Sequence, residues 1–252
     1  CYLKQHCPGF HKLHLQPPIR YQANDPLEQL IFKGFLLEQT DFAVTEIQQP
    51  RLTSYPVKDL LLQPQKLQQI FSLLSLAHYQ TEVTDLWALL DNPQLQVLAL
   101  YQQAGHEQAS AQLQLLGCAV LSYEGQLPAA LATQVYQGER RVQGHLLAQS
   151  LAFHLATPEL ATLRLARVQR IVIHPAWQGH GLGQFLLNAV QKYCQSAGIA
   201  AIGSSFGATP SLLRFWMLQG FLPVKLSAQA EQASGEPSVL MIKVCDSALA
   251  PT

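Results

Sequence analysis

Three glycines at alternate positions, between a β-branched run and a helical pattern, constrain this chain more than any other feature. The run Ile171–Ile173 predicts a strand, His174–Pro175 ends it, and the apolar spacing over 182–197 predicts a helix. Glycine lacks a Cβ atom, so a glycine-rich backbone can approach an anion closely, and the free N–H groups at a helix start point toward that anion. The segment Gln178–Gln184 is therefore predicted to bind a phosphate group, since an ordinary tight turn would need only one glycine.

The same segment lacks the features of two common nucleotide-binding motifs. A dinucleotide fingerprint needs a third glycine where Gln184 stands and an acidic residue about 20 positions later, whereas residues 198–206 contain none. A Walker loop needs Gly-Lys followed by Ser or Thr, and the chain contains no Gly-Lys pair. We therefore expect neither NAD or FAD binding nor ATP hydrolysis by these residues.

A literal Gly-x-Ser-x-Gly motif, Gly203–Gly207, stands between a predicted strand over 199–202 and a predicted helix. This is the context of a hydrolase nucleophile, which needs an acidic residue and then a histidine later in the chain. All nine histidines, of which His180 is the last, precede Ser205. A serine hydrolase is therefore disfavoured.

The composition excludes several other classes. The chain has 252 residues, of which 48% are hydrophobic and 13% charged, so it can bury a substantial core and is not disordered. Its 16 basic and 16 acidic residues cancel, which argues against a protein that binds nucleic acid by itself. No apolar run approaches the roughly 20 residues of a membrane helix, so no membrane association is expected.

Five cysteines, an odd number without CxxC spacing, predict a reducing, cytoplasmic compartment: Cys1, Cys7, Cys118, Cys194 and Cys245. Cysteines and histidines cluster near the N-terminus, but the spacing of Cys1, His6, Cys7, His11 and His14 fits no common structural zinc site. No metal is expected. The chain begins with Cys rather than Met and is expected to be a piece of a longer protein.

Hydrophobic periodicity predicts alternating helices and strands, which is typical of an α/β fold. Asp25, Pro26 and Glu28 suit the cap and the first and third positions of one helix, and residues 40–58 look like a linker. Further helices are predicted over 64–76, 82–91, 127–155 with interruptions near Gly138 and Gly144, 182–197 and 210–219. Strands are predicted over 95–102, 113–123, 168–173, 199–202, 221–226 and 239–244, the first two as an antiparallel pair.

The pattern Gln178-x-x-Gly181-x-Gly183, followed by Arg214-Phe215-Trp216-x-x-x-Gly220-Phe221, resembles the GNAT N-acetyltransferase superfamily. The resemblance implies a GNAT acetyltransferase fold of the α/β class, with a central mixed sheet flanked by helices. It also implies that acetyl-CoA is bound, with its pyrophosphate in the turn and its pantetheine arm beside the later helix.

Longer segments are similar to the acetyltransferase region of the bacterial tRNA(Met) cytidine acetyltransferase family: 141–151, 167–175, 205–207 and 214–216. Gln16–Tyr21 and Asp25–Glu28 resemble the end of that family's helicase-like ATPase module. On this basis residues 1–58 are predicted to be the end of the ATPase module and a linker, and residues 59–247 the GNAT domain.

This resemblance implies acetylation of the exocyclic N4 of the wobble cytidine in elongator tRNA(Met), using acetyl-CoA and ATP hydrolysis. ATP and Mg²⁺ would act only through the module that this chain lacks, and most RNA contacts could lie outside it. Two alternatives stay open: a GNAT enzyme that acetylates a small amine or a protein N-terminus, and an acyl-CoA-binding domain without catalysis. The sequence does not indicate an oligomeric state.

The resemblance also assigns site residues. Backbone donors of Ile171, Val172 and Ile173 would contact the thioester oxygen and the pantetheine arm. The pyrophosphate would be bound by Gln178, Gly179, His180, Gly181, Leu182, Gly183 and Gln184. The coenzyme would also contact Ser211 and Arg214, although Arg214 could instead pair with a carboxylate. His174 could assist catalysis or be structural.

Trp216 stands where many family members carry a tyrosine that can protonate the leaving thiolate, and an indole cannot do so. The tyrosine that usually serves as general acid is therefore missing at this position. Five arginines form either a basic rim for RNA or a solvated face: Arg140, Arg141, Arg164, Arg167 and Arg170.

Overall fold

The computed structural model describes residues 7, 9, 11, 22, 24–36, 49–77, 83–104, 112–230 and 235–245. The chain divides into two compact units, 1–39 and 40–252, and each is described by itself. In the first unit, α2 (Pro26–Gly34) begins as predicted, because the Asp25 carboxylate accepts hydrogen bonds from the backbone N–H groups of Leu27, at 2.8 Å, and Glu28, at 3.3 Å. Most of the predicted features before this helix, among them Gln16–Tyr21, lie outside the described residues.

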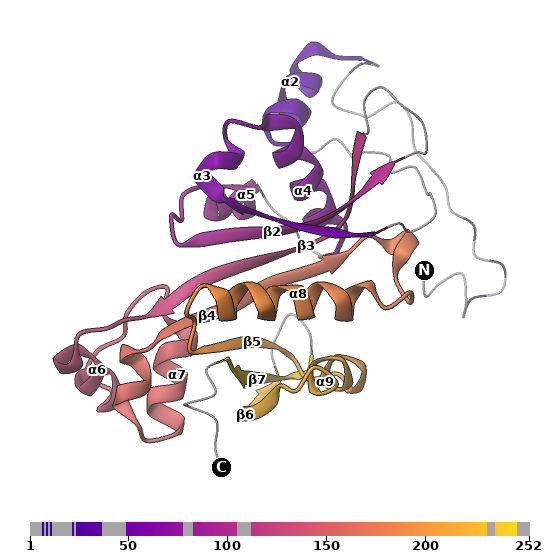
Figure 1. Cartoon of the computed structure of the whole chain (residues 1–252). Helices are drawn as coiled ribbons and strands as arrows, with labels where there is room; N and C mark the ends of the chain where they lie inside the picture. The colour runs from indigo at the N-terminus through magenta and orange to yellow at the C-terminus, as the bar shows by residue number, and fades with distance from the viewer. Residues whose placement is uncertain are drawn as a thin grey trace. The chain divides into compact units, whose positions relative to one another are not determined.

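The second unit contains a seven-stranded sheet with the order β1-β2-β3-β4-β5-β7-β6 (Figure 1). The strands are β1 (Arg51–Pro56), β2 (Leu95–Ala104), β3 (Gln112–Gly125), β4 (Arg164–Ile173), β5 (Ala201–Gly207), β6 (Leu222–Ala230) and β7 (Pro237–Val244). Neighbouring strands are antiparallel except β4 and β5, which pair in parallel. The predicted mixed sheet is therefore confirmed.

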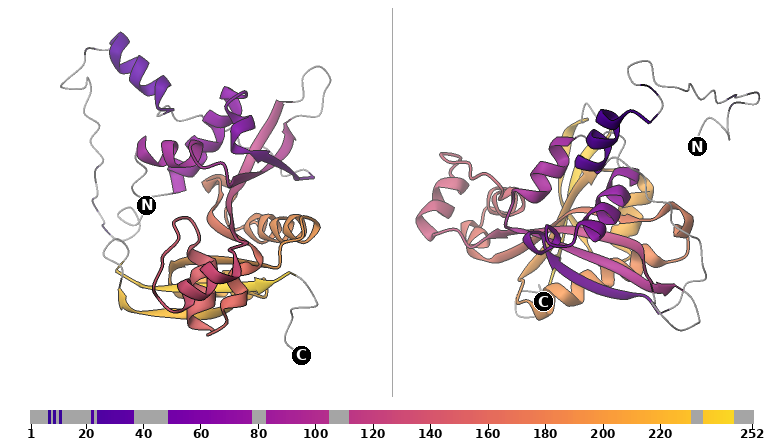
Figure 2. Two further views of the ribbon diagram at one scale, coloured as in Figure 1. Left: turned by 90° about the vertical axis from the view of Figure 1, so that its left-hand side faces the viewer. Right: turned by 90° about the horizontal axis from the view of Figure 1, so that it is seen from above.

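Helices cover both faces of this sheet (Figures 1 and 2). They are α3 (Val57–Leu60), α4 (Pro64–Ala77), α5 (Val83–Leu90), α6 (Ala129–Tyr136), α7 (Leu146–His154), α8 (Leu182–Ser196) and α9 (Pro210–Met217), with the short 3₁₀ helices η1 (Pro158–Thr162) and η2 (Pro175–Trp177). Successive residues of a strand point to opposite faces. Ala119 and Leu121 of β3 pack in the cluster that contains the buried side of α8, whereas Val120 lines a cavity with Phe71 of α4. On that second face α7 packs Leu147 in a cluster with strand residues of β4 and β5.

Two predictions about secondary structure were wrong. Part of the supposed linker, Arg51–Pro56, forms β1 and pairs antiparallel with β2 from Arg51↔Tyr101 to Pro56↔Gln96. The proline at its end is tolerated because β1 is an edge strand. The strand predicted over 199–202 instead spans Ala201–Gly207, so β5 continues through the Gly-x-Ser-x-Gly motif, and Ser205 pairs with Leu240 of β7. This placement removes the strand-to-helix turn that a hydrolase serine needs.

The other predicted helices and strands of this unit are confirmed, with ends that differ by a few residues. The long helical segment 127–155 is interrupted as predicted, and Gly138 and Gly144, with φ of 78° and 83°, lie between α6 and α7. The position of the predicted boundary between the two domains at residue 58 stays a prediction.

Candidate functional site

The parallel pairing of β4 and β5 is short, and the two strands then separate. Backbone pairing covers only Leu165↔Ala201, Ala166↔Ile202 and Arg167↔Gly203, although β5 continues to pair with β7 as far as Gly207. At the point of separation the buried Ser204 hydroxyl donates a hydrogen bond to the Val168 carbonyl at 2.9 Å. Beyond this fork, β4 has no strand partner on its β5 side among the described residues.

Two backbone amides of β4 face the fork. The N–H of His174 donates to the Leu116 carbonyl of β3 at 2.9 Å, so alternation along the strand directs the N–H groups of Ile173 and Ile171 away from β3. Val172 pairs with Cys118 and its N–H faces β3. Of the three predicted backbone donors, the structure therefore places Ile171 and Ile173 at the fork and Val172 on the other side.

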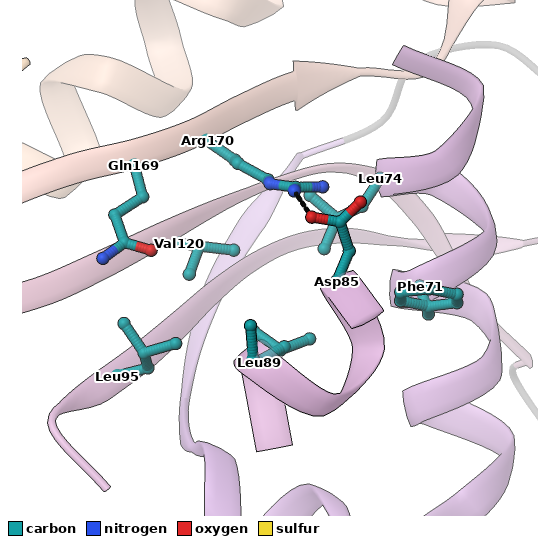
Figure 3. A pocket seen from close by; sticks show the side chains of 9 residues that line it. Phe71, Leu74, Asp85, Leu89, Leu95, Val120, Gln169 and Arg170 are labelled. Carbon is teal, nitrogen blue, oxygen red and sulfur yellow. Dashed lines mark hydrogen bonds and ion pairs between the residues drawn. The ribbon is translucent and has the colours of Figure 1, made fainter. Parts of the chain in front are cut away.

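A bulge in β4 precedes these amides. Val120 of β3 pairs with Arg170 and Leu121 pairs with Val168, which leaves Gln169 as the extra residue. Gln169 and Arg170 line a small cavity of about 60 Å³ against α4 and α5, and Arg170 forms an ion pair of 2.6 Å with Asp85 of α5 (Figure 3). The ion pair thus ties the segment before Ile171 to the helical layer behind it.

The turn that follows β4 is held by its own side chains. The Nδ1 atom of His174 accepts a hydrogen bond from the Ala176 N–H at 3.2 Å, and burial lowers the pKa of this histidine. Trp177 is buried, with its ring centroid 4.9 Å from that of His174. The Gln178 side chain reaches back and donates to the Ile173 carbonyl at 3.0 Å. The strand end and the start of the glycine turn are therefore one braced unit.

The three glycines of the turn have two different roles. Gly179 and Gly181 adopt φ of 82° and 79°, a left-handed conformation that other residues rarely adopt, and a Cβ atom on either would meet nothing within 4 Å. Gly183 instead allows close packing, because its Cβ would lie 3.2 Å from the Phe215 ring of α9. The first two glycines shape an open turn, and the third lets α9 pack against the start of α8.

This turn leaves the N-terminus of α8 open. Gly181 is its N-cap, no side chain caps it, and its first turn contains no acidic residue. The first N–H groups of a helix have no partner within the helix, and they carry the positive end of its dipole. Gly179, His180, Gly181 and Gln184 are exposed, so an anion can reach these groups from solvent.

Helix α9 contributes two exposed polar side chains and one buried ring. Ser211 Oγ lies 3.3 Å from Thr209 Oγ1, and Arg214 is exposed and forms no ion pair with any described residue. Trp216 is only 3% exposed and stacks on Phe206 with centroids 5.6 Å apart, while the Phe221 ring meets it edge-on at 4.8 Å. The indole therefore packs in the core.

Sequence reasoning missed one buried acidic residue near the fork. Glu124 at the end of β3 is 2% exposed, and its Oε2 accepts a hydrogen bond of 2.6 Å from the Leu147 N–H at the start of α7. Its Oε1 is 2.5 Å from Arg167 Nε and accepts a hydrogen bond of 3.1 Å from the Ser122 hydroxyl. The only signal in the sequence was an acidic residue directly after an apolar strand.

The five arginines do not form one rim. Arg164 donates to the Ala197 carbonyl at 2.6 Å, Arg167 pairs with Glu124, and Arg170 pairs with Asp85. Arg140 and Arg141 instead line a hollow between α6 and α7. Three of the five arginines are therefore held by the fold itself.

Neither a metal-binding cluster nor a membrane-spanning helix is found in the described part of the chain. In it, no three His, Cys, Asp or Glu side chains are grouped closely enough to hold a metal ion. Of the N-terminal cysteines and histidines, whose spacing fits no common zinc site, Cys1, His6 and His14 lie outside the described residues. No described helix is both long and apolar enough to cross a membrane.

A family model described as GNAT acetyltransferase 2 matches residues 69–200 and 194–246, which include the fork, the turn and α9. The chain belongs to this family. A second model, described as the helicase domain of RNA cytidine acetyltransferase NAT10/TcmA, matches residues 1–38. The GNAT fold expected from the glycine turn and the aromatic pair of α9 is thereby confirmed.

Several curated relatives have the same name, tRNA(Met) cytidine acetyltransferase TmcA. The protein from Nitrosococcus halophilus is 38% identical over 239 residues, covering 93% of this chain and 31% of the relative. That from Vibrio cholerae is 34% identical, covering 94% and 32%, and that from Haloarcula marismortui is 36% identical, covering 90% and 29%. This GNAT chain therefore spans about a third of the length of the relatives it matches.

Among solved structures, the chain is similar to the ribosomal-protein-S18-alanine N-acetyltransferase from Escherichia coli, with a TM-score of 0.48 and 14% sequence identity. That similarity covers 81% of this chain and 97% of the solved one.

Proposed function

We propose that this chain is the acetyltransferase region of an enzyme that transfers an acetyl group from acetyl-CoA to N4 of the wobble cytidine in elongator tRNA(Met). The observation that carries the proposal is the 38% identity over 239 residues with a tRNA(Met) cytidine acetyltransferase, which covers nearly the whole chain. The relatives favour this acceptor over a small amine or a protein N-terminus. We infer a cytoplasmic location because tRNA is modified there.

The open turn and the fork fit acetyl-CoA. The pyrophosphate would lie against the N–H groups at the start of α8, where Gly179 and Gly181 leave space that side chains would fill. The pantetheine arm carries amides that can pair with strand backbone, and the Ile171 and Ile173 amides face the fork where β5 no longer occupies that edge. Exposed Ser211 and Arg214 on α9 would contact the coenzyme beside it.

The transfer step needs little from acidic or basic side chains. The N4 lone pair of cytidine attacks the thioester carbonyl, a C–N bond forms, the C–S bond breaks, and one N4 proton is lost to solvent while the thiolate leaves. The amine is neutral at pH 7, so no deprotonation has to precede attack. A backbone N–H at the fork would stabilise the charge that develops on the carbonyl oxygen.

Neither His174 nor Trp216 is placed as a strong proton donor or acceptor. Trp216 is buried and its indole cannot protonate a thiolate. The His174 Nδ1 is used as an acceptor by Ala176, which puts the ring proton on Nε2, and the lowered pKa keeps the ring neutral near pH 7. We therefore propose that His174 acts by shaping the turn, and single-turnover kinetics of a His174 variant would test a catalytic role.

The rest of the reaction would depend on parts beyond this chain. Residues 1–38 match a helicase domain, which supports the proposal that they are the last part of a module that uses ATP and Mg²⁺. The GNAT domain would then begin near residue 58. That module would supply much of the attraction to tRNA, because the chain itself has 16 basic and 16 acidic residues.

Mass spectrometry of tRNA nucleosides tests the proposal directly. We expect N4-acetylcytidine to disappear from elongator tRNA(Met) when the gene is deleted, and to return when the intact gene is restored. Its persistence in the deletion strain would contradict the proposed acceptor. Unchanged acetylation with a restored gene that encodes Gly181→Val would contradict the proposed coenzyme site.

A further inference from the structure

A hollow of about 700 Å³ lies between the α6–α7 loop, α7 and β6, and we call it the α6–α7 hollow. This volume is within the range of about 300–1,000 Å³ that is usual for ligand sites. Arg140 and Arg141 of the loop and Lys225 of β6 line it, and no Asp or Glu is among its described lining residues. It is therefore a concentration of positive charge in a chain whose total charge is zero.

The three cations of the hollow have no anionic partner in the described part of the chain. The ion pairs found there join Arg167 to Glu124 and Arg170 to Asp85. Glu139 precedes Arg140 in sequence and forms no ion pair with it. Burial and the charge of Lys225 lower the pKa of His154, another lining residue, so this imidazole is mostly neutral near pH 7 and cannot pair with the three cations as an anion. An external anion is the remaining partner.

An aromatic ring stands beside these cations. Phe153 lines the hollow and is 56% exposed, which is unusual for a phenylalanine, and its ring meets the His154 ring edge-on at 5.2 Å. Cations that can bind phosphates, next to an exposed ring on which a base can stack, are the combination that single-stranded nucleic acid requires. An acidic peptide would use the cations and leave the ring without a role.

The loop that presents the arginines is held in place. The Gln149 side chain accepts from the Val142 N–H at 2.9 Å and donates to the Val142 carbonyl at 2.6 Å and to the His145 carbonyl at 3.0 Å. The His145 Nδ1 in turn accepts from the Gly125 N–H at 2.9 Å. A site built on a braced loop loses less conformational entropy when it binds.

Helix α7 also connects the hollow to the fork. Its Leu147 side chain packs so closely on Gly203 that a Cβ there would lie 2.5 Å from Leu147 Cδ1. Gly203 pairs with Arg167 in the last paired position of β4 and β5, and Glu124 binds both Arg167 and the Leu147 N–H. The helix that lines the hollow is therefore seated where the two strands separate.

We propose that the α6–α7 hollow binds the single-stranded RNA that flanks the acceptor cytidine, with phosphates on Arg140, Arg141 and Lys225 and one base stacked on Phe153. This inference rests on the proposed function for the identity of the RNA. It assigns to the GNAT domain a contact with the substrate that is separate from the coenzyme turn.

The test measures binding of a 12-nucleotide oligocytidylate to the 252-residue chain across a salt series. The triple variant Arg140→Ala/Arg141→Ala/Lys225→Ala should lower affinity at least about tenfold and reduce the slope of log K against log salt by about 2, since each phosphate contact on a single strand contributes roughly 0.7. Phe153→Leu should lower affinity about tenfold and leave the slope unchanged, and Phe153→Tyr should restore it. Lys192→Ala, an exposed cation on α8, serves as the control and should change neither quantity.

Calorimetry with acetyl-CoA on the same variants separates this inference from the proposed function. Unchanged acetyl-CoA affinity with weakened RNA binding would support both. If the chain binds acetyl-CoA but RNA affinity is absent, or is the same in the triple variant as in Lys192→Ala, the hollow is not an RNA site and the proposed function stands. The inference would also be overturned if oligoglutamate bound as tightly as the oligocytidylate and Phe153→Leu left the affinity for RNA unchanged. That result would favour an acidic protein segment as the ligand.

Discussion

Two helices of this domain, α7 and α8, begin in opposite ways. At the N-terminus of α7 the protein itself provides the hydrogen-bond acceptor. The buried Glu124 carboxylate accepts hydrogen bonds from the backbone N–H groups of Leu147 and Ala148 at 2.6 and 3.4 Å. The N-terminus of α8 follows Gly181, has no side-chain cap and is exposed. Both helix starts attract negative charge, because the helix dipole places partial positive charge at the N-terminus.

The start of α7 is thus part of the architecture, whereas we propose that the start of α8 serves a ligand. At α7 the protein supplies the anion and joins it to Arg167 of β4, so the arrangement fixes a helix against the sheet. At α8 two glycines with positive φ keep side chains away, so an anion at this helix start would have to come from outside the described part of the chain. Changes at the first should alter stability, and changes at the second should alter coenzyme binding.

The largest expected effect is on stability, from Glu124→Gln. Removal of this charge leaves Arg167 without its partner in a mostly buried pair, which should lower the free energy of unfolding by about 3–5 kcal/mol in urea titrations. Asp85→Asn is the matched control, because its pair with Arg170 is about a quarter exposed and should contribute about 0–1 kcal/mol.

Acetyl-CoA affinity of folded Glu124→Gln should equal that of the unchanged chain. A stability loss no greater than that of Asp85→Asn would show that the helix start of α7 does not depend on an internal anion, and the contrast with α8 would fail.

These two helix starts also show what the sequence could predict. The turn at α8 was predictable because a turn shaped by its backbone constrains residue types, and Gly179, Gly181 and Gly183 show that constraint at alternate positions within one short segment. Glu124 was not, because its partners Arg167 and Leu147 are distant in sequence and nothing in the sequence pairs them. A site made of side chains from separate elements has no local pattern.

The secondary structure also contains parts that the sequence could predict and parts that it could not. Periodicity predicted most helices and strands of the GNAT domain, since local spacing reflects a buried face. It missed β1, a short edge strand in a segment with two prolines, and it ended the strand before Gly203 although β5 extends to Gly207. The fork between β4 and β5 has no local pattern in the sequence, because strand separation depends on pairing between residues far apart.

Trp216→Phe should have a smaller effect, on the rate of acetylation, and it tests whether a side chain beside the start of α8 takes part in the chemistry. The indole packs between Phe206 and Phe221 and is not placed to transfer protons, so a phenylalanine should keep the aromatic contacts. We expect single-turnover acetylation at saturating acetyl-CoA, in the full-length enzyme, to stay within about tenfold. A loss of more than about a hundredfold in a folded variant, about 2.7 kcal/mol, would show a direct role in the chemistry.

The smallest expected effect concerns His174, which supports the turn before α8. Burial lowers its pKa, so the unfolded chain takes up a proton more readily, and stability falls as the pH drops below about 6.5 through the lower folded pKa. His174→Asn keeps an acceptor for the Ala176 N–H and removes the titration.

Urea unfolding at pH 7.5 and 5.5 should therefore show a weaker pH dependence in His174→Asn than in the unchanged chain. Equal dependence would contradict the structural role. A large loss of single-turnover acetylation in this variant would favour the catalytic one.

Calorimetry with acetyl-CoA on two glycine variants tests whether the open helix start of α8 binds the coenzyme through its backbone. Gly181 and Gly198 lie at opposite ends of α8 with φ of 79° and 68°, and a Cβ on either meets nothing within 4 Å. Valine should therefore strain both sites similarly, and alanine at the same positions replaces it if either valine variant fails to fold. We expect Gly181→Val to lower the affinity for acetyl-CoA at least about tenfold and Gly198→Val to leave it unchanged. Equal affinity in the two folded variants would contradict the assignment of the coenzyme to this turn.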